Sequence, residues 1–339
     1  MKPAREQTIL AVDGGNSKAD VALVAGDGRM VAALRGPTVS HQALGFDAAR
    51  EGLAQLVGQA WAAAGTRPAG ARVAEIGVFC LAGADTPPDV RRLEQTVAAL
   101  ELAHHDVVLN DAFAILRAGT ARPWGVSVIA GAGVNAAGVA PDGRMARLDA
   151  LGDISGDWGG GLSIGWAGVA AAVRGRDGRG PRTVLERTVP GHFGLRGPAA
   201  LTSALYRGRI REARIRELSP VVFAGAVDGD AVARGIVDRM ADEVVTMATA
   251  LIRRLRMTAL DVEVVLGGGV FRADDPAFYA RIDSGIRLVA PSARIVRLTA
   301  QPVLGAALLG LDRLEGLSER ERHEAEERLR TALEAWRPD

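Results

Sequence analysis

The fold is decided by the stretch ILAVDGGNSKADVALVAGDGRMVAAL, residues 9–34, and by its partial repetition as VSVIAGAGVNAAGVAPDGRMARL, residues 126–148. Each stretch begins with an apolar strand, passes through a glycine-rich turn into a second strand, and reaches a third through an Asp-Gly-Arg-Met turn. Asp-Gly favours a hairpin because glycine adopts positive φ without steric cost. Chance similarity between two glycine-rich hairpins is the alternative, but the shared order of three features favours duplication. We therefore predict two related domains that face each other across a cleft.

The rest of the sequence fits two α/β domains. Its 339 residues exceed what one core usually serves, and the 48% that are hydrophobic argue against extensive disorder. Apolar runs alternate with longer helical segments, as in α/β proteins. We expect strands at residues 9–13, 19–24, 30–34, 76–81, 107–110, 127–129, 136–139, 262–266 and 294–296, and helices at 45–64, 88–100, 112–118, 162–173, 199–206, 231–255 and 303–314. Residues 174–182 are expected to form a mobile surface loop, and residues 318–336 a charged helix.

Charge and cysteine content exclude several classes of protein. The 41 basic and 40 acidic residues leave a net charge of +1, and no basic stripe is interleaved with aromatics, so no nucleic-acid partner is expected. The single cysteine, Cys80, cannot form a disulfide or a four-thiolate metal site within one subunit. Residues 1–8 are polar and no long apolar run is free of charge or glycine, so we expect a cytoplasmic protein without a membrane partner.

The first glycine-rich turn has the composition of a phosphate-binding site. It contains Asp13, Gly14, Gly15, Asn16, Ser17 and Lys18. Backbone N–H groups of such a turn can approach an anion, and the aspartate that ends the strand can hold Mg²⁺ directly or through water. A Walker A loop is excluded, because its pattern is absent and a strand follows rather than a helix. An ordinary hairpin turn is the competing interpretation.

Two further glycine clusters are candidate nucleotide contacts. Gly131, Ala132 and Gly133 begin a G-x-G-x-x-A pattern, but a strand follows, which disfavours an NAD-dependent dehydrogenase and favours a second phosphate-binding hairpin. Gly267, Gly268 and Gly269 follow an apolar strand, where backbone without side chains can pass close to a purine ring. A purely structural role for these three glycines is the alternative.

Asp111 is the candidate general base. It lies where an apolar strand ends and a helix begins, which is where α/β proteins place reactive groups. A kinase that transfers phosphate to a hydroxyl needs a carboxylate to orient that hydroxyl and accept its proton. Capping of the helix that follows is the competing role.

Polar loops supply candidate sugar contacts. The loop GDISGDWGGG, residues 152–161, brings two carboxylates and Trp158 together, and these could hydrogen-bond and stack on a sugar. Its aspartates could equally cap the next helix. Residues 38–42, which include Ser40 and His41, offer further polar groups, although none of the histidines shows a metal-ligand pattern.

Taken together, these motifs resemble the superfamily of sugar kinases, heat-shock chaperone ATPases and actin, and within it the BadF/BadG/BcrA/BcrD ATPase branch, which includes N-acetylglucosamine kinases. The likeness runs from residue 9 to about residue 314. VDGGNSK (12–18) resembles the first phosphate motif, IAGAGVNAAG (129–138) the second, VVLGGGV (264–270) the adenosine motif, LNDAFA (109–114) the segment with the catalytic aspartate, and GDWGGG (156–161) the sugar-binding loop. In that loop Trp158 stands where the family usually has Glu, and Gly160 where it often has Ser.

This resemblance implies two actin-like (ribonuclease H-like) domains flanking an ATP-binding cleft. Residues 1–118, completed by C-terminal helices at about 303–339, would form one domain, and residues 119–302 the other. The implied activity is ATP-dependent phosphorylation of an amino sugar, N-acetylglucosamine or glucosamine, at O6. Mg²⁺ would lie at Asp13, and Asp111 would act as the base. The implied sugar contacts are Ser40, His41, Asp111, Asn135, Gly156 and Asp157.

The same resemblance implies a homodimer, since relatives of this kind commonly dimerise. An ATPase switch that acts on a partner protein, with no small-molecule acceptor, is the alternative function.

Overall fold

The computed structural model describes residues 7–65, 72 and 74–337, and the chain divides into two compact units. Unit 1 combines Met1–Gly125 with Leu298–Asp339, and unit 2 is Val126–Arg297. The sequence placed these boundaries at 118/119 and 302/303. The structure moves them to the start of strand β6 (Gly125–Ala130) and the end of strand β10 (Arg294–Arg297). The first six residues, on which the expectation about the N-terminus largely rests, lie outside the described residues.

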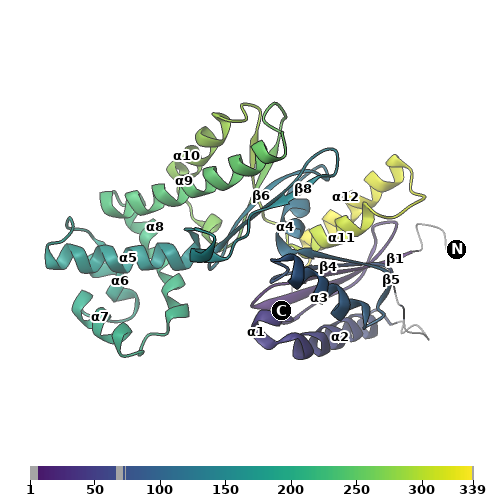
Figure 1. Cartoon of the computed structure of the whole chain (residues 1–339), viewed down its shortest axis with the longest axis horizontal. Helices are drawn as coiled ribbons and strands as arrows, with labels where there is room; N and C mark the ends of the chain where they lie inside the picture. The colour runs from purple at the N-terminus through teal and green to yellow at the C-terminus, as the bar shows by residue number, and fades with distance from the viewer. Residues whose placement is uncertain (1–6, 66–71, 73, 338–339) are drawn as a thin grey trace. The chain divides into compact units, whose positions relative to one another are not determined.

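Within the described residues, each unit is built on a five-stranded sheet (Figure 1). The strands are β1 (Thr8–Gly14), β2 (Lys18–Ala25), β3 (Met30–Pro37), β4 (Ala74–Leu81), β5 (Ala103–Asn110), β6, β7 (Val134–Val139), β8 (Met145–Arg147), β9 (Glu263–Gly267) and β10. The sheet orders are β3-β2-β1-β4-β5 and β8-β7-β6-β9-β10. β4 runs parallel to β1 as β9 runs parallel to β6, and the outer pairs β2–β3 and β7–β8 are antiparallel. The repeat predicted from the sequence is therefore a structural duplication.

The two Asp-Gly turns have the same geometry. Gly28 and Gly143 take φ of 80° and 85°, in the left-handed region that glycine enters without strain. In each turn the next backbone N–H donates to the aspartate, Asp27 or Asp142, at 3.0 Å. Equivalent residues thus close equivalent hairpins in the two units.

Helices cover both faces of the unit 1 sheet. They are α1 (His41–Leu44), α2 (Phe46–Ala63), α3 (Pro87–Ala98), α4 (Asp111–Gly119), α11 (Val303–Leu311) and α12 (Glu319–Ala335). Because side chains alternate along a strand, Leu10 and Val12 of β1 pack with α2 and α3, whereas Ile9 and Ala11 pack with α4, α11 and α12. The C-terminal helices, yellow in Figure 1, therefore belong to the same core as the N-terminal strands, drawn in purple.

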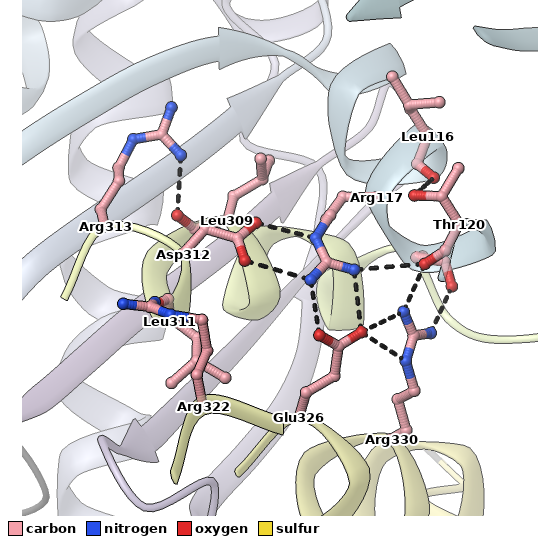
Figure 2. A network of polar contacts seen from close by, with 11 residues as sticks. Leu116, Arg117, Thr120, Leu309, Leu311, Asp312, Arg313, Arg322, Glu326 and Arg330 are labelled. Atoms are coloured by element: carbon pink, nitrogen blue, oxygen red, sulfur yellow. Dashed lines mark hydrogen bonds and ion pairs between the residues drawn. The ribbon is translucent and has the colours of Figure 1, made fainter. Parts of the chain in front are cut away.

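A buried ion network fastens α12 to α4 (Figure 2). The Arg117 guanidinium is 3% exposed and donates to Asp312 at 2.8 and 3.1 Å and to Glu326 at 3.0 and 2.8 Å. Arg330 of α12 also donates to Glu326, at 2.8 Å, and to the carbonyl oxygen of Thr120, at 2.6 Å. The helix that begins at the candidate base is thus held at its far end by the C-terminal helices.

Unit 2 carries its helices mainly between β8 and β9. They are α5 (Gly160–Asp177), α6 (Leu185–His192), α7 (Pro198–Tyr206), α8 (Ser219–Val227), α9 (Ala231–Arg254) and α10 (Pro276–Arg287), with short 3₁₀ helices η2 (Gly152–Ile154), η3 (Glu212–Leu218) and η4 (Gly269–Arg272). The expectation of a mobile loop at residues 174–182 is partly wrong. α5 continues to Asp177 and ends at Gly178, which takes a left-handed φ of 80°.

The charged C-terminal tail forms a helix, as predicted. Ser318 and Glu321 make a capping box at the start of α12, and Leu329 and Leu333 are fully buried. Among the described residues, no helix combines the length and the apolar character needed to cross a membrane.

Candidate active site

The carboxyl ends of three parallel strands meet at one edge of the unit 1 sheet. In the strand register Gly14 of β1 pairs with Leu81 of β4, and Leu81 pairs with Asn110 of β5. Asp13 lies at the end of β1 and Asp111 directly follows β5. The structure therefore brings these two sequence-predicted carboxylates to the same edge.

Asn110, not Asp111, is the N-cap of α4. Its Oδ1 accepts a hydrogen bond from the N–H of Ala112 at 3.1 Å, and its Nδ2 donates to Asp85 at 3.0 Å. Asp111 is the first residue within the helix and is half-buried. The capping interpretation of Asp111 is therefore wrong, and its chemical role stays a prediction.

Negative charge is concentrated around Asp13. Burial, together with the charges of Asp111 and Asp20, raises the pKa of Asp13 from 3.8 to about 8, although Lys18 and Arg35 act in the opposite direction. A cation near this carboxylate would relieve that repulsion. The electrostatics of the edge therefore favour a positively charged ligand.

Two residues of this site, Asp20 and Arg35, were missed by the sequence analysis. Asp20 is fully buried and lies directly opposite Asp13 in the β1–β2 register. Arg35 of β3 donates to both of its oxygens, at 2.6 and 2.7 Å, and also to Gln301, at 3.1 Å. The available signal was an acid inside the otherwise apolar strand KADVALVA. A buried acid of this kind requires a partner such as Arg35.

The residues present fit a Mg²⁺ ion that is bound together with phosphate, not a separate metal centre. Within the described part of the chain, no group of three or more histidine, cysteine or acidic side chains could hold a metal by itself. Mg²⁺ is usually bound through one or two carboxylates together with substrate phosphates and water. Asp13, which lies at the carboxyl end of β1 beside the charges of Asp111 and Asp20, is the carboxylate that could hold such an ion.

The segment after β3 supports the first glycine turn. Ser40 is 2% exposed, and its hydroxyl donates to Asn16 Oδ1 at 2.5 Å. The Thr38 hydroxyl donates to the carbonyl oxygen of Gly15 at 2.8 Å. The structure thus brings Ser40 together with the candidate phosphate turn.

His41 follows at the start of α1. Its ring stacks on Phe46 at 4.4 Å between centroids, and burial lowers the pKa of its imidazole despite the nearby carboxylates of Asp89 and Asp85. Its Nδ1 is buried and lacks a hydrogen-bond partner among the described residues. His41 therefore has one ring nitrogen, Nδ1, that no described residue satisfies.

Unit 2 contains a cavity of about 620 Å³. It is lined by Gly131 and Ala132 of the second glycine turn, by Gly161 at the start of α5, by Gly269 after β9, and by Phe223 and other residues of α8. The N–H of Gly161 donates to Gly131 O at 2.8 Å, so the turn and the helix form one continuous backbone surface. Two of the predicted nucleotide motifs therefore line the same cavity.

The three glycines at the carboxyl end of β9, Gly267, Gly268 and Gly269, differ in their surroundings. Gly267 is the last residue of β9. Gly268 has φ of 103°, and a Cβ there would lie 2.5 Å from the carbonyl oxygen of Ala130, so its role is to allow close packing of backbone. Gly269 has open space around it and lines the cavity.

The loop before α5 does not cap that helix. The N-cap of α5 is Gly159, without a side-chain hydrogen bond, so the capping interpretation of the loop aspartates is wrong. The Asp157 carboxylate instead accepts hydrogen bonds from the Ser155 hydroxyl and the N–H of Gly152. Trp158 is covered by the guanidinium of Arg239, 4.0 Å from the ring centroid.

The other predicted sugar contacts lie near this loop in the chain or in the second hairpin. Gly156 is exposed, with φ of 76°. Asn135 is half-buried in β7, and its side-chain oxygen accepts a hydrogen bond from the N–H of Ala136 at 2.8 Å. Gly133 accepts the hydrogen bond that closes the second turn, from the N–H of Gly131 at 2.9 Å.

Helix α8 was also missed by the sequence analysis, although it forms one wall of the cavity. Its sequence, SPVVFAGAV, is apolar on nearly every side, so no helical stripe was visible. The proline directly after its first residue was the one available signal of a helix start.

Comparison with known proteins defines the class. Residues 10–310 match the model of the BadF/BadG/BcrA/BcrD ATPase family, and the chain belongs to this family. The fold is also that of sugar kinases of known structure. A structure of a candidate N-acetylglucosamine kinase from Chromobacterium violaceum superposes with a TM-score of 0.70 at 22% identity, covering 90% of this chain and 99% of the other. A structure of a ROK family glucokinase from Streptomyces griseus superposes with a TM-score of 0.54 at 16% identity, covering 90% of this chain and 99% of the other.

Two curated relatives match over nearly their whole lengths. The N-acetylmuramic acid/N-acetylglucosamine kinase of Clostridium acetobutylicum is 27% identical over 304 residues, which cover 89% of this chain and 97% of the relative. The N-acetyl-D-glucosamine kinase of Dictyostelium discoideum is 26% identical over 322 residues, covering 91% and 98%.

Proposed function

We propose that this protein is an ATP-dependent kinase that phosphorylates an amino sugar, N-acetylglucosamine or glucosamine, at O6. The observation that carries the proposal is the cavity of unit 2, which is lined by the second glycine turn and by Gly269 of the adenosine motif. The carboxylates of Asp13 and Asp111 at one sheet edge of unit 1 add the groups that phosphoryl transfer needs. The names of both curated relatives support an amino sugar as the acceptor.

The unit 2 cavity suits a nucleotide. Its volume of about 620 Å³ lies within the range usual for small-molecule sites. Backbone at Gly131 and Ala132 can approach phosphate without side chains in the way, and the apolar side of α8, including Phe223, can cover a purine. We therefore place ATP in this cavity, with its phosphates at the glycine turn.

Asp111 would hold the acceptor hydroxyl and take its proton as the phosphate is transferred. A Mg²⁺ ion held by Asp13 and the phosphate oxygens would neutralise charge on the transferred group. Ser40, His41, Asn135, Gly156 and Asp157 would hold the other sugar groups. Catalysis of this kind consists mainly of positioning and charge stabilisation.

The substrate class is tested by measuring ADP release from MgATP with a panel of acceptors. N-acetylglucosamine, glucosamine, N-acetylmuramic acid and glucose would be compared, and the phosphorylated position would be read by ³¹P–¹H NMR. We expect stimulation by an amino sugar and a phosphate at O6. Slow ADP release that no sugar stimulates would overturn the kinase and favour an ATPase switch.

The base is tested with Asp111→Asn. Loss of a positioned base usually costs about 10²-fold or more, so turnover should fall by that factor while ADP binding is kept. Asp106→Asn is the matched control, because Asp106 is an exposed carboxylate on the same strand β5. Near-normal turnover of the Asp111 variant would remove it from the mechanism.

A further inference from the structure

One wall of the unit 2 cavity changes in character along its length. Pro220, Ala224 and Val227 are exposed on one side of α8 at spacings of four and three residues, and all three line the cavity. Asp228 follows Val227 at the C-terminal end of this apolar strip. At the N-terminal end, Arg216 lies four residues before Pro220. The wall therefore runs from a cation through apolar surface to a carboxylate.

The cationic end adjoins the second glycine turn. A Cβ added to Gly161 would lie 3.1 Å from the Cβ of Arg216 and 3.4 Å from the carbonyl oxygen of Gly131. Gly161 is thus enclosed by Arg216 on one side and by the candidate phosphate turn on the other. Arg216 and the backbone of Gly131 consequently border the same end of the cavity.

The Arg216 guanidinium is not used by the fold. Throughout the described part of the chain, no hydrogen bond or ion pair engages it, and the residue is exposed. Its neighbour in η3, Arg214, differs, because it donates to Glu217 twice at 2.9 Å. An arginine that lines a cavity without a protein partner can pair with an anion through its planar fork of donors.

We infer that Arg216 binds a phosphate group of the nucleotide, an inference that rests on the proposed function. The guanidinium adds a positive charge to a turn that otherwise offers only neutral backbone donors. The carboxylate of Asp228 at the opposite end disfavours phosphate there, so the two residues together orient the nucleotide along α8. Arg216 is a binding residue for the phosphate chain, separate from the base Asp111.

The test compares binding of adenosine, ADP and ATP by isothermal titration calorimetry to the wild type, Arg216→Gln and Arg216→Lys. A charge-assisted hydrogen bond lost from a phosphate predicts about 10-fold weaker binding of ADP and ATP to Arg216→Gln, with adenosine affinity unchanged. Arg216→Lys, which keeps the charge but loses the fork, should lie between the two. Arg211→Gln is the matched control, since Arg211 is an exposed arginine at the start of η3 that does not line the cavity.

Three results would overturn the inference. They are unchanged ADP affinity in Arg216→Gln, an equal loss for adenosine and ADP, and an equal loss in the Arg211 control. Failure of the proposed function looks different, because a wild type that binds neither ADP nor ATP would refute the nucleotide site itself. Arg216 is exposed, so its substitution should leave the melting temperature unchanged, and this is checked on the same samples.

Discussion

Replacement of Arg117 by leucine should destabilise unit 1 by about 3 kcal/mol, because it leaves the half-buried carboxylate of Asp312 without its cation. Asp312 and Glu326 are only 18% and 15% exposed. Removal of one member of a buried ion pair typically costs about 3–5 kcal/mol. Glu326 and the carbonyl oxygen of Thr120 retain Arg330, so within the described residues only Asp312 loses its basic partner (Figure 2). We therefore expect the lower end of that range.

The assay is chemical denaturation followed by circular dichroism across a range of pH. Burial by itself would raise the pKa of Glu326. The hydrogen bonds and charges of Arg117 and Arg330 outweigh burial, so the pKa of Glu326 lies below its ordinary value of 4.5. A carboxylate with a lowered pKa contributes stability above its unfolded-state pKa and loses that contribution as the pH falls through its folded-state pKa. The difference in free energy of unfolding between wild type and Arg117→Leu should therefore be largest at neutral pH and shrink in acid below about pH 4.5.

Two controls sharpen this prediction. Arg328→Leu removes an arginine of the same helix α12 that is 55% exposed, and should cost less than about 1 kcal/mol. Leucine at Arg117, Asp312 and Glu326 together removes all three charges and should recover much of the lost stability. A single variant as stable as wild type at neutral pH, or a difference that grows in acid, would refute the reasoning.

Further predictions concern close packing and the single thiol. Gly305→Ala would put a Cβ 1.8 Å from a backbone oxygen of α4, so it should lower the free energy of unfolding by about 3 kcal/mol in denaturant titrations. The control, Gly58→Ala, has open space at an exposed helical site and should be neutral or stabilising. Gly160→Ala, at φ of 72° and with its Cβ 2.5 Å from Gly133 O, should weaken ADP binding by about 10-fold or more in calorimetry, and normal affinity would show that this contact does not shape the turn. Burial raises the pKa of the Cys80 thiol well above its ordinary value. A thiol reagent at pH 8 should therefore label no thiol in the native protein and one thiol after unfolding, and fast labelling of the native protein would contradict the burial.

Much of the candidate site could be proposed from the sequence because its signals are local. A carboxylate at the end of an apolar strand followed by two glycines identifies Asp13 and the first turn without knowledge of distant contacts. The same is true of Gly131 and of Asp111, which follow apolar strands directly. Each of these patterns lies within a few consecutive residues, where backbone preferences are set by neighbours.

Other parts of the site could not be predicted because they depend on contacts across the fold. The buried pair of Asp20 and Arg35 needs the β2–β3 register, which brings residues fifteen positions apart into direct contact. The positions of Arg216 and Phe223 matter because four separate segments of unit 2 line one cavity. No local sequence pattern around these residues shows which distant residues they contact in the fold.

Short sequence patterns are sufficient to predict the duplicated hairpins, the α/β class and the positions of the glycine-rich turns, because glycine conformation and alternation of apolar residues are properties of short segments. Three features required the folded structure: Asn110 caps α4 in place of Asp111, Gly269 lines the cavity while Gly268 packs against β6, and the pKa of Asp13 rises to about 8. The physical reason is that capping competition, close backbone contact and desolvation all depend on groups brought together from distant parts of the chain.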